Sequence, residues 1–352
     1  MSFDAWPSVV ELADSVRRGE RKASELLDLA LERIAAGNEE LNAFVHVDEP
    51  IARAAADAVD AAVARGDDPG PLAGVPVGVK DLHNCAGMPT SHGSLWFKGG
   101  PPVEHDDIDV ARLRQAGAVP VGKTSAPEFG IVSFASTKAW GVTHNPWLHD
   151  RTPGGSSSGS AAAVAAGIVP LATASDGGGS IRIPAAFTGL VGHKPSHGRV
   201  PHPGPMHSQT SVVGVVTTTV ADAARCLDVQ AGPDERDRTS LPPPGVRYED
   251  VIEALDVAGL RARWSLDLGF VEHVDPEVAE LSRAAAEQLA DAAGLDLDEE
   301  PVHLGDDATK VWLSAGVLSQ WVMDDLAERW PARKAELMGF TRTGMEASEA
   351  IT

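Results

Sequence analysis

The feature that most constrains this chain is a pair of loops rich in glycine and serine, Thr152–Ser160 and Asp176–Arg182. An alanine-rich run and a short apolar run separate them. Alanine has the highest helix propensity, so a helix is expected over 161–166, with Gly167 suited to its C-terminal end. The apolar, partly β-branched residues 168–174 favour a buried strand. The chain thus leaves one loop on a helix and returns on a strand to the other, so serines of both loops can share one site.

The rest of the chain also alternates helical patterns with short apolar segments. Helices are expected from the capping box at Ser8 to Gly19, from about Leu26 to Gly37, and over 51–65, 109–116, 219–230, 278–293 and 309–326. Strands are expected over 71–81, 118–124, 212–217 and 260–264. Short apolar strands between helices are typical of an α/β sheet covered on both faces.

Composition excludes several classes of protein. With 352 residues, 43% of them apolar and 23% charged, the chain can bury a large core. Its net charge of -22 opposes binding to nucleic acid or to an anionic membrane. The two cysteines, Cys85 and Cys226, exclude a disulfide scaffold and favour a reducing compartment. The start of the sequence is not typical of a signal peptide and no run is suited to span a bilayer, so a cytoplasmic protein is expected.

Ser180 is a candidate nucleophile because it follows the three glycines 177–179. Consecutive glycines allow backbone N–H groups to converge on one point, as an oxyanion hole requires. The alternatives are a plain glycine turn and a phosphate-binding loop. The sequence contains no GxxxxGK[ST] motif, and no ribose-binding acid follows these glycines in a strand–turn–helix context.

A serine nucleophile needs a base. The histidines at 193, 197, 202 and 207 lie among prolines without metal-ligand spacing, so they are interpreted as loop residues, and neither a metal nor another cofactor is expected. Lys80 ends an apolar strand, where burial would lower its pKa toward that of a neutral amine. An ordinary exposed lysine at a strand end is the competing interpretation.

Ser157 is a rival nucleophile, because Gly155–Gly159 matches the G-x-S-x-G nucleophile elbow. The elbow requires a preceding strand. The segment 145–153 is polar and contains two prolines, Pro146 and Pro153, which argues against that context.

Several motifs, taken together and in order, resemble the amidase signature family of serine hydrolases. They lie between about residues 70 and 230 and read GVPVGVKD at 74–81, GKT at 122–124 with PEFG at 127–130, NPW at 145–147, PGGSSSGS at 153–160, SDGGGSIR at 175–182 and GLVG at 189–192 with KPS at 194–196. The resemblance implies a mixed, largely parallel central sheet covered by helices on both faces, in a single amidase domain over 1–352.

The resemblance also implies a Ser-cisSer-Lys triad that hydrolyses amides through an acyl-enzyme intermediate. By motif, Ser180 corresponds to the nucleophile, Ser156 to the bridging serine after a cis peptide bond, and Lys80 to the base. The backbone N–H groups of Gly177, Gly178, Gly179 and Ser180 correspond to the oxyanion hole. Three neighbours are expected to support this site: Ser157, and the pair Asp176 and Arg182, which can brace the glycine loop.

A small-molecule amide is therefore the expected substrate, and self-association into a homo-oligomer is compatible with the sequence. The first alternative is a glutaminase-type A subunit of a tRNA-dependent amidotransferase, although Ile183 stands where such subunits typically have glutamine after Ser-Ile-Arg. Family members usually have a residue larger than glycine at position 177 and continue well past residue 352. The second alternative is therefore a truncated, inactive member that lacks the usual C-terminal part of the domain.

Overall fold

The computed structural model describes residues 3–202, 210–298, 300–312, 326 and 328–349. The chain forms two compact units. Met1–Glu249 together with Gln320–Thr352 make up the larger one, and Asp250–Ser319 the smaller. The larger unit contains every residue that the sequence nominates for the site. The expectation of a single domain over the whole chain stays a prediction.

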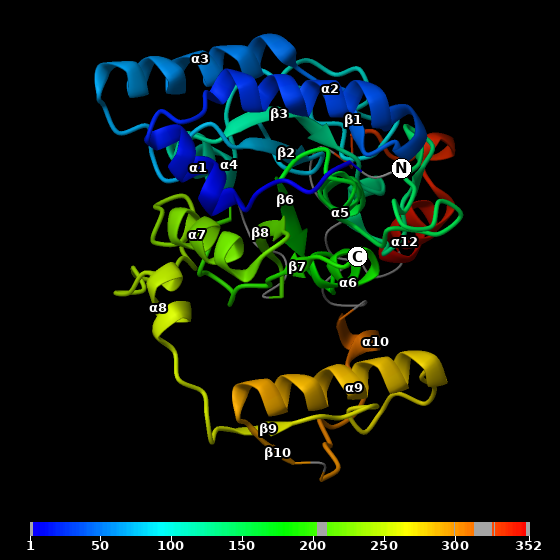
Figure 1. Ribbon diagram of the computed structural model, residues 1–352. Helices are drawn as coiled ribbons and strands as arrows, with labels where there is room; N and C mark the ends of the chain where they lie inside the picture. Colours follow the sequence, from blue (N-terminus) through cyan, green and yellow to red (C-terminus); the bar gives the residue numbers. More distant parts are fainter. Residues whose placement is uncertain (1–2, 203–209, 299, 313–325, 327, 350–352) are drawn as a thin grey trace. The chain divides into compact units, whose positions relative to one another are not determined.

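The larger unit is built on a mixed sheet of six strands (Figure 1). Their order is β1 (Phe44–Val47), β3 (Val119–Thr124), β2 (Pro76–Lys80), β6 (Leu171–Asp176), β8 (Val212–Thr217) and β7 (Val191–Gly192). The central strand β2 pairs in parallel with β3 and β6, whereas the outer pairs are antiparallel. The predicted α/β fold with a mixed sheet is confirmed.

The sheet centre is covered by protein on both faces, because every residue of β2 and β3 is buried. The helices of this unit are α1 (Val9–Arg17), α2 (Ala23–Leu41), α3 (Glu49–Arg65), α4 (Ile108–Gln115), α5 (Ser158–Ala165), α6 (Arg182–Thr188), α7 (Val220–Gln230) and α12 (Gly339–Glu349). In Figure 1, α2 and α3 lie side by side near β3, and both pack against that strand. Helix α5 packs against β2 and β6, and α7 packs against β8.

Short elements complete the larger unit: the β4–β5 hairpin (Ser136–Thr137 and Gly141–Val142) and the 3-10 turns η1 (Glu128–Gly130) and η4 (Lys334–Glu336). Helix α8 (Tyr248–Ala254) lies at the boundary between the units. In the smaller unit, α9 (Pro276–Ala293) connects the parallel strands β9 (Arg261–Arg263) and β10 (Asp296–Asp298). Helix α10 (Thr309–Trp312) covers the start of the predicted helix over 309–326, and most of the remainder lies outside the described residues.

Two predicted helix ends had different outcomes. The capping box at Ser8 is present, with the Ser8 hydroxyl accepting the backbone N–H of Glu11. The predicted end of the second helix at Gly37 is wrong, because α2 continues to Leu41 and ends where Asn42 adopts a left-handed conformation with φ 52°. Gly37 serves packing instead: a Cβ at this position would lie 3.0 Å from the Phe3 ring.

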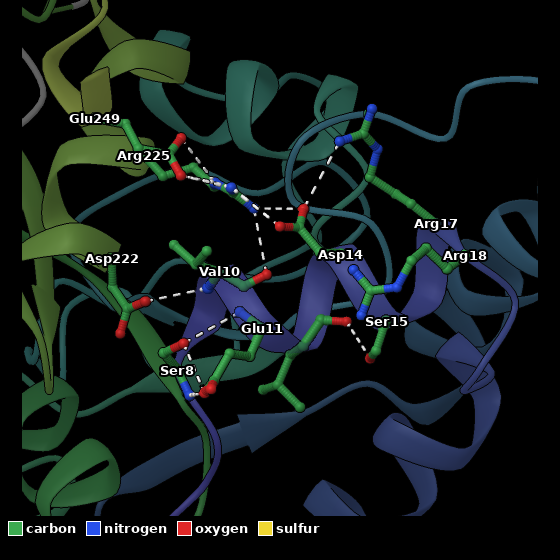
Figure 2. Close-up of polar contacts among 12 residues, drawn as sticks. Ser8, Val10, Glu11, Asp14, Ser15, Arg17, Arg18, Asp222, Arg225 and Glu249 are labelled. Atoms are coloured by element: carbon green, nitrogen blue, oxygen red, sulfur yellow. Dashed lines mark hydrogen bonds and ion pairs between the residues drawn. The ribbon is translucent and has the colours of Figure 1, made fainter. Parts of the chain in front are cut away.

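Helix α1 is fixed to α7 by a polar network (Figure 2). The Asp222 carboxylate accepts the N–H of Val10 in the first turn of α1, at 3.1 Å. Arg225 of α7 lies between Asp14 and Glu249 and forms ion pairs with both (Figure 2). A cation with two carboxylate partners holds three segments together.

Among the helices of the described residues, none combines the length and the apolar character that a membrane span requires.

Candidate active site

Lys80 is the last residue of β2, and its side chain is completely buried. Its Nζ lies 2.9 Å from the Oγ of Ser156. The backbone N–H of Lys80 donates to the Thr173 hydroxyl on β6, also at 2.9 Å. The end of the strand is therefore fixed to its neighbour, and the amine is directed at the first glycine-serine loop.

Burial lowers the pKa of Lys80 from 10.5 to about 7, because the charged form loses its hydration. The carboxylate of Asp176 opposes this shift and favours the charged form. A lysine with a pKa near neutrality is uncharged in a large fraction of molecules and can accept a proton. The competing interpretation of an exposed lysine is wrong.

Ser156 and Ser157 are the last residues of the first glycine-serine loop, directly before α5. The Gly155–Ser156 peptide bond is cis, as the resemblance implied, and the Ser156 side chain is almost fully buried. Ser157 is the N-cap residue of α5, is fully buried, and also places its Oγ 2.9 Å from Lys80 Nζ. No strand precedes Ser157 in this described segment, so the context of a nucleophile elbow is absent.

Ser180 lies in the second loop, half-buried, where its backbone carbonyl accepts the N–H of Ser157 at 3.3 Å. Both loops therefore meet, as the sequence predicted. No hydrogen bond joins the hydroxyls of Ser156 and Ser180 in the described part of the chain. Such contacts are often long in free enzymes and shorten when substrate binds. Solvent reaches the Ser180 side of this arrangement, while the lysine is covered.

Asp176 and Arg182 form the expected pair at the base of the glycine loop. Nε and Nη2 of Arg182 each lie 2.9 Å from a carboxylate oxygen of Asp176. Asp176 also accepts the N–H groups of Gly179 at 2.7 Å and Ile181 at 3.1 Å. Burial alone would raise the pKa of Asp176, but Arg182 and these N–H groups outweigh burial and lower it. Asp176 is therefore an ionised anchor for the loop.

The same contacts distinguish among the predicted oxyanion donors. The Gly179 N–H donates to Asp176, and Gly179 adopts φ +123°, which a side chain would disfavour. The N–H groups of Gly177, Gly178 and Ser180 have no hydrogen-bond partner among the described residues. These three groups are available to a ligand, whereas that of Gly179 is engaged in shaping the loop.

Two residues of the site were not predicted from the sequence. The hydroxyl of Ser175 lies 2.9 Å from Lys80 Nζ. The signal for it is the alternation along β6, because Thr173 and Ser175 are two residues apart and both face Lys80. Gly130 is the second: a Cβ on it would lie 3.2 Å from Ser156 Oγ and 2.7 Å from Leu82 Cδ1. The turn η1 therefore lies directly against Ser156.

A second buried polar cluster follows Lys80 in the chain. The backbone N–H of His83 donates to the Lys80 carbonyl at 2.8 Å, and its ring Nδ1 lies 2.9 Å from Asp109 Oδ2. Lys123 is buried on β3 and donates to the His83 carbonyl and to Thr90. Burial lowers the pKa of Lys123.

Of the histidines interpreted as loop residues, His207 lies outside the described part of the chain. Within the described part, no cluster of side chains suited to hold a metal ion occurs.

Comparison with known proteins identifies the family. The family model described as Amidase matches residues 25–326 of the chain. The chain belongs to the amidase signature family. The structure of a bacterial aryl acylamidase of this family superposes with a TM-score of 0.92 at 28% identity, covering 99% of this chain and 73% of that one.

Two curated relatives illustrate the range of the family. The A subunit of the glutamyl-tRNA(Gln) amidotransferase of Synechococcus sp. (strain RCC307) is 46% identical over 292 residues, which is 82% of this chain and 58% of the relative. The acylamidase of Rhodococcus erythropolis is 36% identical over 354 residues, which is 99% of this chain and 72% of the relative. The chain thus spans little more than half the length of the amidotransferase subunits that it matches.

Proposed function

We propose that this chain hydrolyses the C–N bond of a carboxylic amide, using Lys80 as base, Ser156 as relay and Ser180 as nucleophile. The observation that carries the proposal is the buried Lys80 amine, 2.9 Å from the Ser156 hydroxyl and with a pKa of about 7. Membership of the amidase signature family supports it, as does the similarity to acylamidases.

In the proposed mechanism, neutral Lys80 accepts the proton of Ser156 while Ser156 accepts that of Ser180. The Ser180 oxygen forms a bond to the amide carbonyl carbon, and the carbonyl oxygen becomes an oxyanion. The relay then returns one proton to the leaving nitrogen as the C–N bond breaks, which releases an amine or ammonia. Water attacks the acyl-enzyme by the same proton path, which releases the acid and restores Ser180.

The oxyanion is proposed to bind the N–H groups of Gly177, Gly178 and Ser180. Donors that are already oriented toward the developing charge stabilise it without reorganisation. Asp176 supports this role by accepting the N–H of Gly179, which holds the loop in shape. Of the three glycines expected to form the oxyanion hole, Gly177 and Gly178 are therefore proposed as donors to the oxyanion. Gly179 is proposed to hold the shape of the loop.

The activity is tested by amine release from a panel of acyl p-nitroanilides and primary amides. The wild-type chain is expected to release nitroaniline or ammonia, and Lys80→Ala and Ser180→Ala are each expected to lose this activity by at least about 10³-fold. Ser160→Ala is the matched control, because Ser160 is a buried hydroxyl on α5 that contacts Thr124 and the Thr173 carbonyl but not Lys80. Retained activity in either site variant contradicts the triad.

A second candidate is glutamine hydrolysis of the kind expected for an amidotransferase A subunit. The 46% identity to the Synechococcus protein favours it. Ile183 weighs against it, because glutamine is the residue expected at this position in such subunits. Ammonia release from free glutamine, with acyl anilides as the comparison, separates the candidates. Activity on glutamine alone supports the second candidate.

The cytoplasm is the proposed location, because both cysteines are unpaired, buried thiols of the kind retained in a reducing compartment. The proposed partner is the amide substrate alone, and association into a homo-oligomer stays a prediction.

A further inference from the structure

The amine of Lys80 is surrounded by three serine hydroxyls and not by one. Its Nζ lies 2.9 Å from the Oγ atoms of Ser156, Ser157 and Ser175. The amine is fully buried, so these oxygens replace the water that an exposed lysine would bind. The proposed mechanism assigns a step to Ser156 only. The other two hydroxyls need an explanation.

The number of hydrogen-bond donors and lone pairs on the Lys80 amine explains why three hydroxyls surround it. A neutral amine has two N–H donors and one lone pair, whereas an ammonium has three donors and no lone pair. If Ser156 is to give its proton to Lys80, the lone pair must point at Ser156. The two N–H groups must then point at Ser157 and Ser175. After the transfer, the three N–H groups face the three hydroxyl oxygens, and the Ser175 carbonyl oxygen lies farther from Nζ, at 3.5 Å. Both protonation states are therefore satisfied without movement.

The surroundings hold the Ser157 hydroxyl as an acceptor. The Ser157 hydroxyl lies 3.4 Å from the Ser175 carbonyl oxygen, to which it can donate its own proton, and the N–H of Ser175 approaches Ser157 Oγ at 3.4 Å. Ser175 belongs to β6, and its backbone pairs with Val213 of β8. A hydroxyl on a central strand is placed by the sheet, which is more rigid than a loop.

We propose that Ser175, together with Ser157, is a positioning residue that holds the two N–H groups of neutral Lys80 and so directs the lone pair at Ser156. This inference rests on the proposed role of Lys80 as base. Ser175 itself exchanges no proton in the reaction. Its action is on the orientation and charge of Lys80.

Few charges oppose or reinforce this effect. On β6 and α6, the pair Asp176 and Arg182 lies at the end of the strand that carries Ser175, and Asp176 favours the charged form of Lys80. On β3, Lys123 pairs in register with Val79 and therefore points to the other face of the sheet from Lys80. At the start of α5, the N-cap residue Ser157 faces the amine with its uncharged hydroxyl.

Removal of the Ser175 hydroxyl takes one acceptor from the amine. The ammonium loses more than the neutral amine, because hydrogen bonds to a charged donor are about twice as strong. Ser175→Ala is therefore expected to shift the acid limb of kcat/KM to lower pH, by about one unit. The plateau of kcat is expected to fall about 10–100-fold, because the lone pair is no longer held. KM is expected to stay unchanged, and Ser175→Thr, which keeps a hydroxyl, is expected to restore both values.

A measurement without turnover tests the same point. In the Ser180→Ala background, the Nζ-bonded carbon of Lys80 is titrated by ¹³C NMR after labelling of lysine, and its signal is assigned by its loss in Lys80→Met. Addition of Ser175→Ala is expected to lower the midpoint, whereas the matched control Ser160→Ala is expected to leave it unchanged. Ser175→Cys, which replaces the oxygen with a weaker acceptor, is expected to give an intermediate midpoint and is the alternative if the alanine variant does not fold.

An unchanged Lys80 midpoint and an unchanged acid limb in the Ser175 variants overturn the inference, even if Lys80→Ala and Ser180→Ala both abolish hydrolysis. The proposed function then stands alone. Persistent hydrolysis in Lys80→Ala removes the proposed function itself, which is a different result.

Discussion

The side-chain nitrogen of Lys80 lies 2.9 Å from the hydroxyl oxygen of Ser156, inside a sheet-to-loop junction that excludes water. Strand β2 lies between β3 and β6 and pairs in parallel with both. The two glycine-serine loops meet beside the end of β2 that carries Lys80. The buried amine is thus placed where it can accept a proton, while the half-buried Ser180 can contact a substrate.

The pH dependence of hydrolysis follows from the pKa of Lys80. Burial lowers this pKa to about 7, and the base is active only when it is neutral. We expect kcat/KM to increase about tenfold per pH unit below 7 and to reach a plateau above it. The measurement is kcat/KM from pH 5 to pH 9 in buffers of constant ionic strength. A profile that is flat down to pH 5 would exclude Lys80 as the titrating base.

The burial of Lys80 also has a cost in stability that depends on pH. Between about 7 and 10.5 the unfolded chain binds this proton and the folded chain does not, so folding stability rises with pH across that range. Lys80→Met lacks this dependence. We expect the variant to gain roughly 1 kcal/mol or more over wild type below pH 7, and less as the pH approaches 10.

Urea unfolding at pH 6 and pH 9.5 measures this difference. The exposed Lys22, replaced by methionine, serves as the control and should show the same difference from wild type at both pH values. A Lys80→Met variant that is less stable than wild type at pH 6 would contradict the account.

Gly130 is expected to control the position of Ser156. Alanine at this position would place its Cβ 3.2 Å from Ser156 Oγ, on a backbone with φ +73°. Small displacements of reacting groups cost up to about 100-fold in rate, so Gly130→Ala should lower kcat about 10–100-fold. Gly99→Ala is the matched control, since Gly99 has φ +76° and nothing within 4 Å of its Cβ position. An equal decrease of kcat in the two variants would show that strain at a positive φ, and not the contact with Ser156, causes the loss of rate.

The contact between His83 and Asp109 is expected to stabilise the fold. Burial would raise the pKa of Asp109, but His83 outweighs it and keeps the pKa below 3.8. The contribution of Asp109 is therefore present above about pH 4 and is lost as the pH falls through its folded pKa. His83→Phe leaves a buried carboxylate without its partner and should cost about 3–5 kcal/mol at pH 7.

Chemical denaturation at pH 7 measures the cost. The double variant His83→Phe with Asp109→Leu removes the carboxylate together with its partner and should recover most of the stability, because no buried ion remains. If the double variant is as unstable as the single one, packing and not charge explains the loss.

Local patterns predicted the elements whose causes are local. The capping box at Ser8 and the strand over 212–217 are present as expected, and so is the helix predicted over 219–230, which begins after its N-cap Thr219. The second helix was predicted to end at Gly37, because glycine often ends a helix. The residue packs against Phe3 instead, a contact between segments 34 residues apart that no local pattern contains.

The site shows the same division between local and tertiary causes. Motif resemblance placed Lys80, Ser156 and Ser180 together, and the loops that carry them do meet. Ser175 was not foreseen, because its contact with Lys80 requires that both side chains lie on the same face of the sheet, which depends on the pairing of β2 with β6. The bond from Gly179 to Asp176 was not foreseen either, because it follows from the conformation of the loop and not from its composition.

The most direct test of the proposed function is the intact mass of the protein after reaction with a fluorophosphonate probe, which labels activated serines. Wild type, Ser180→Ala and Ser157→Ala are compared at pH 8. The proposed function predicts one adduct in wild type, the same adduct formed more slowly in Ser157→Ala because Ser157 contacts Lys80, and none in Ser180→Ala. An adduct that is lost only in Ser157→Ala, or no adduct in folded wild-type protein, would contradict it.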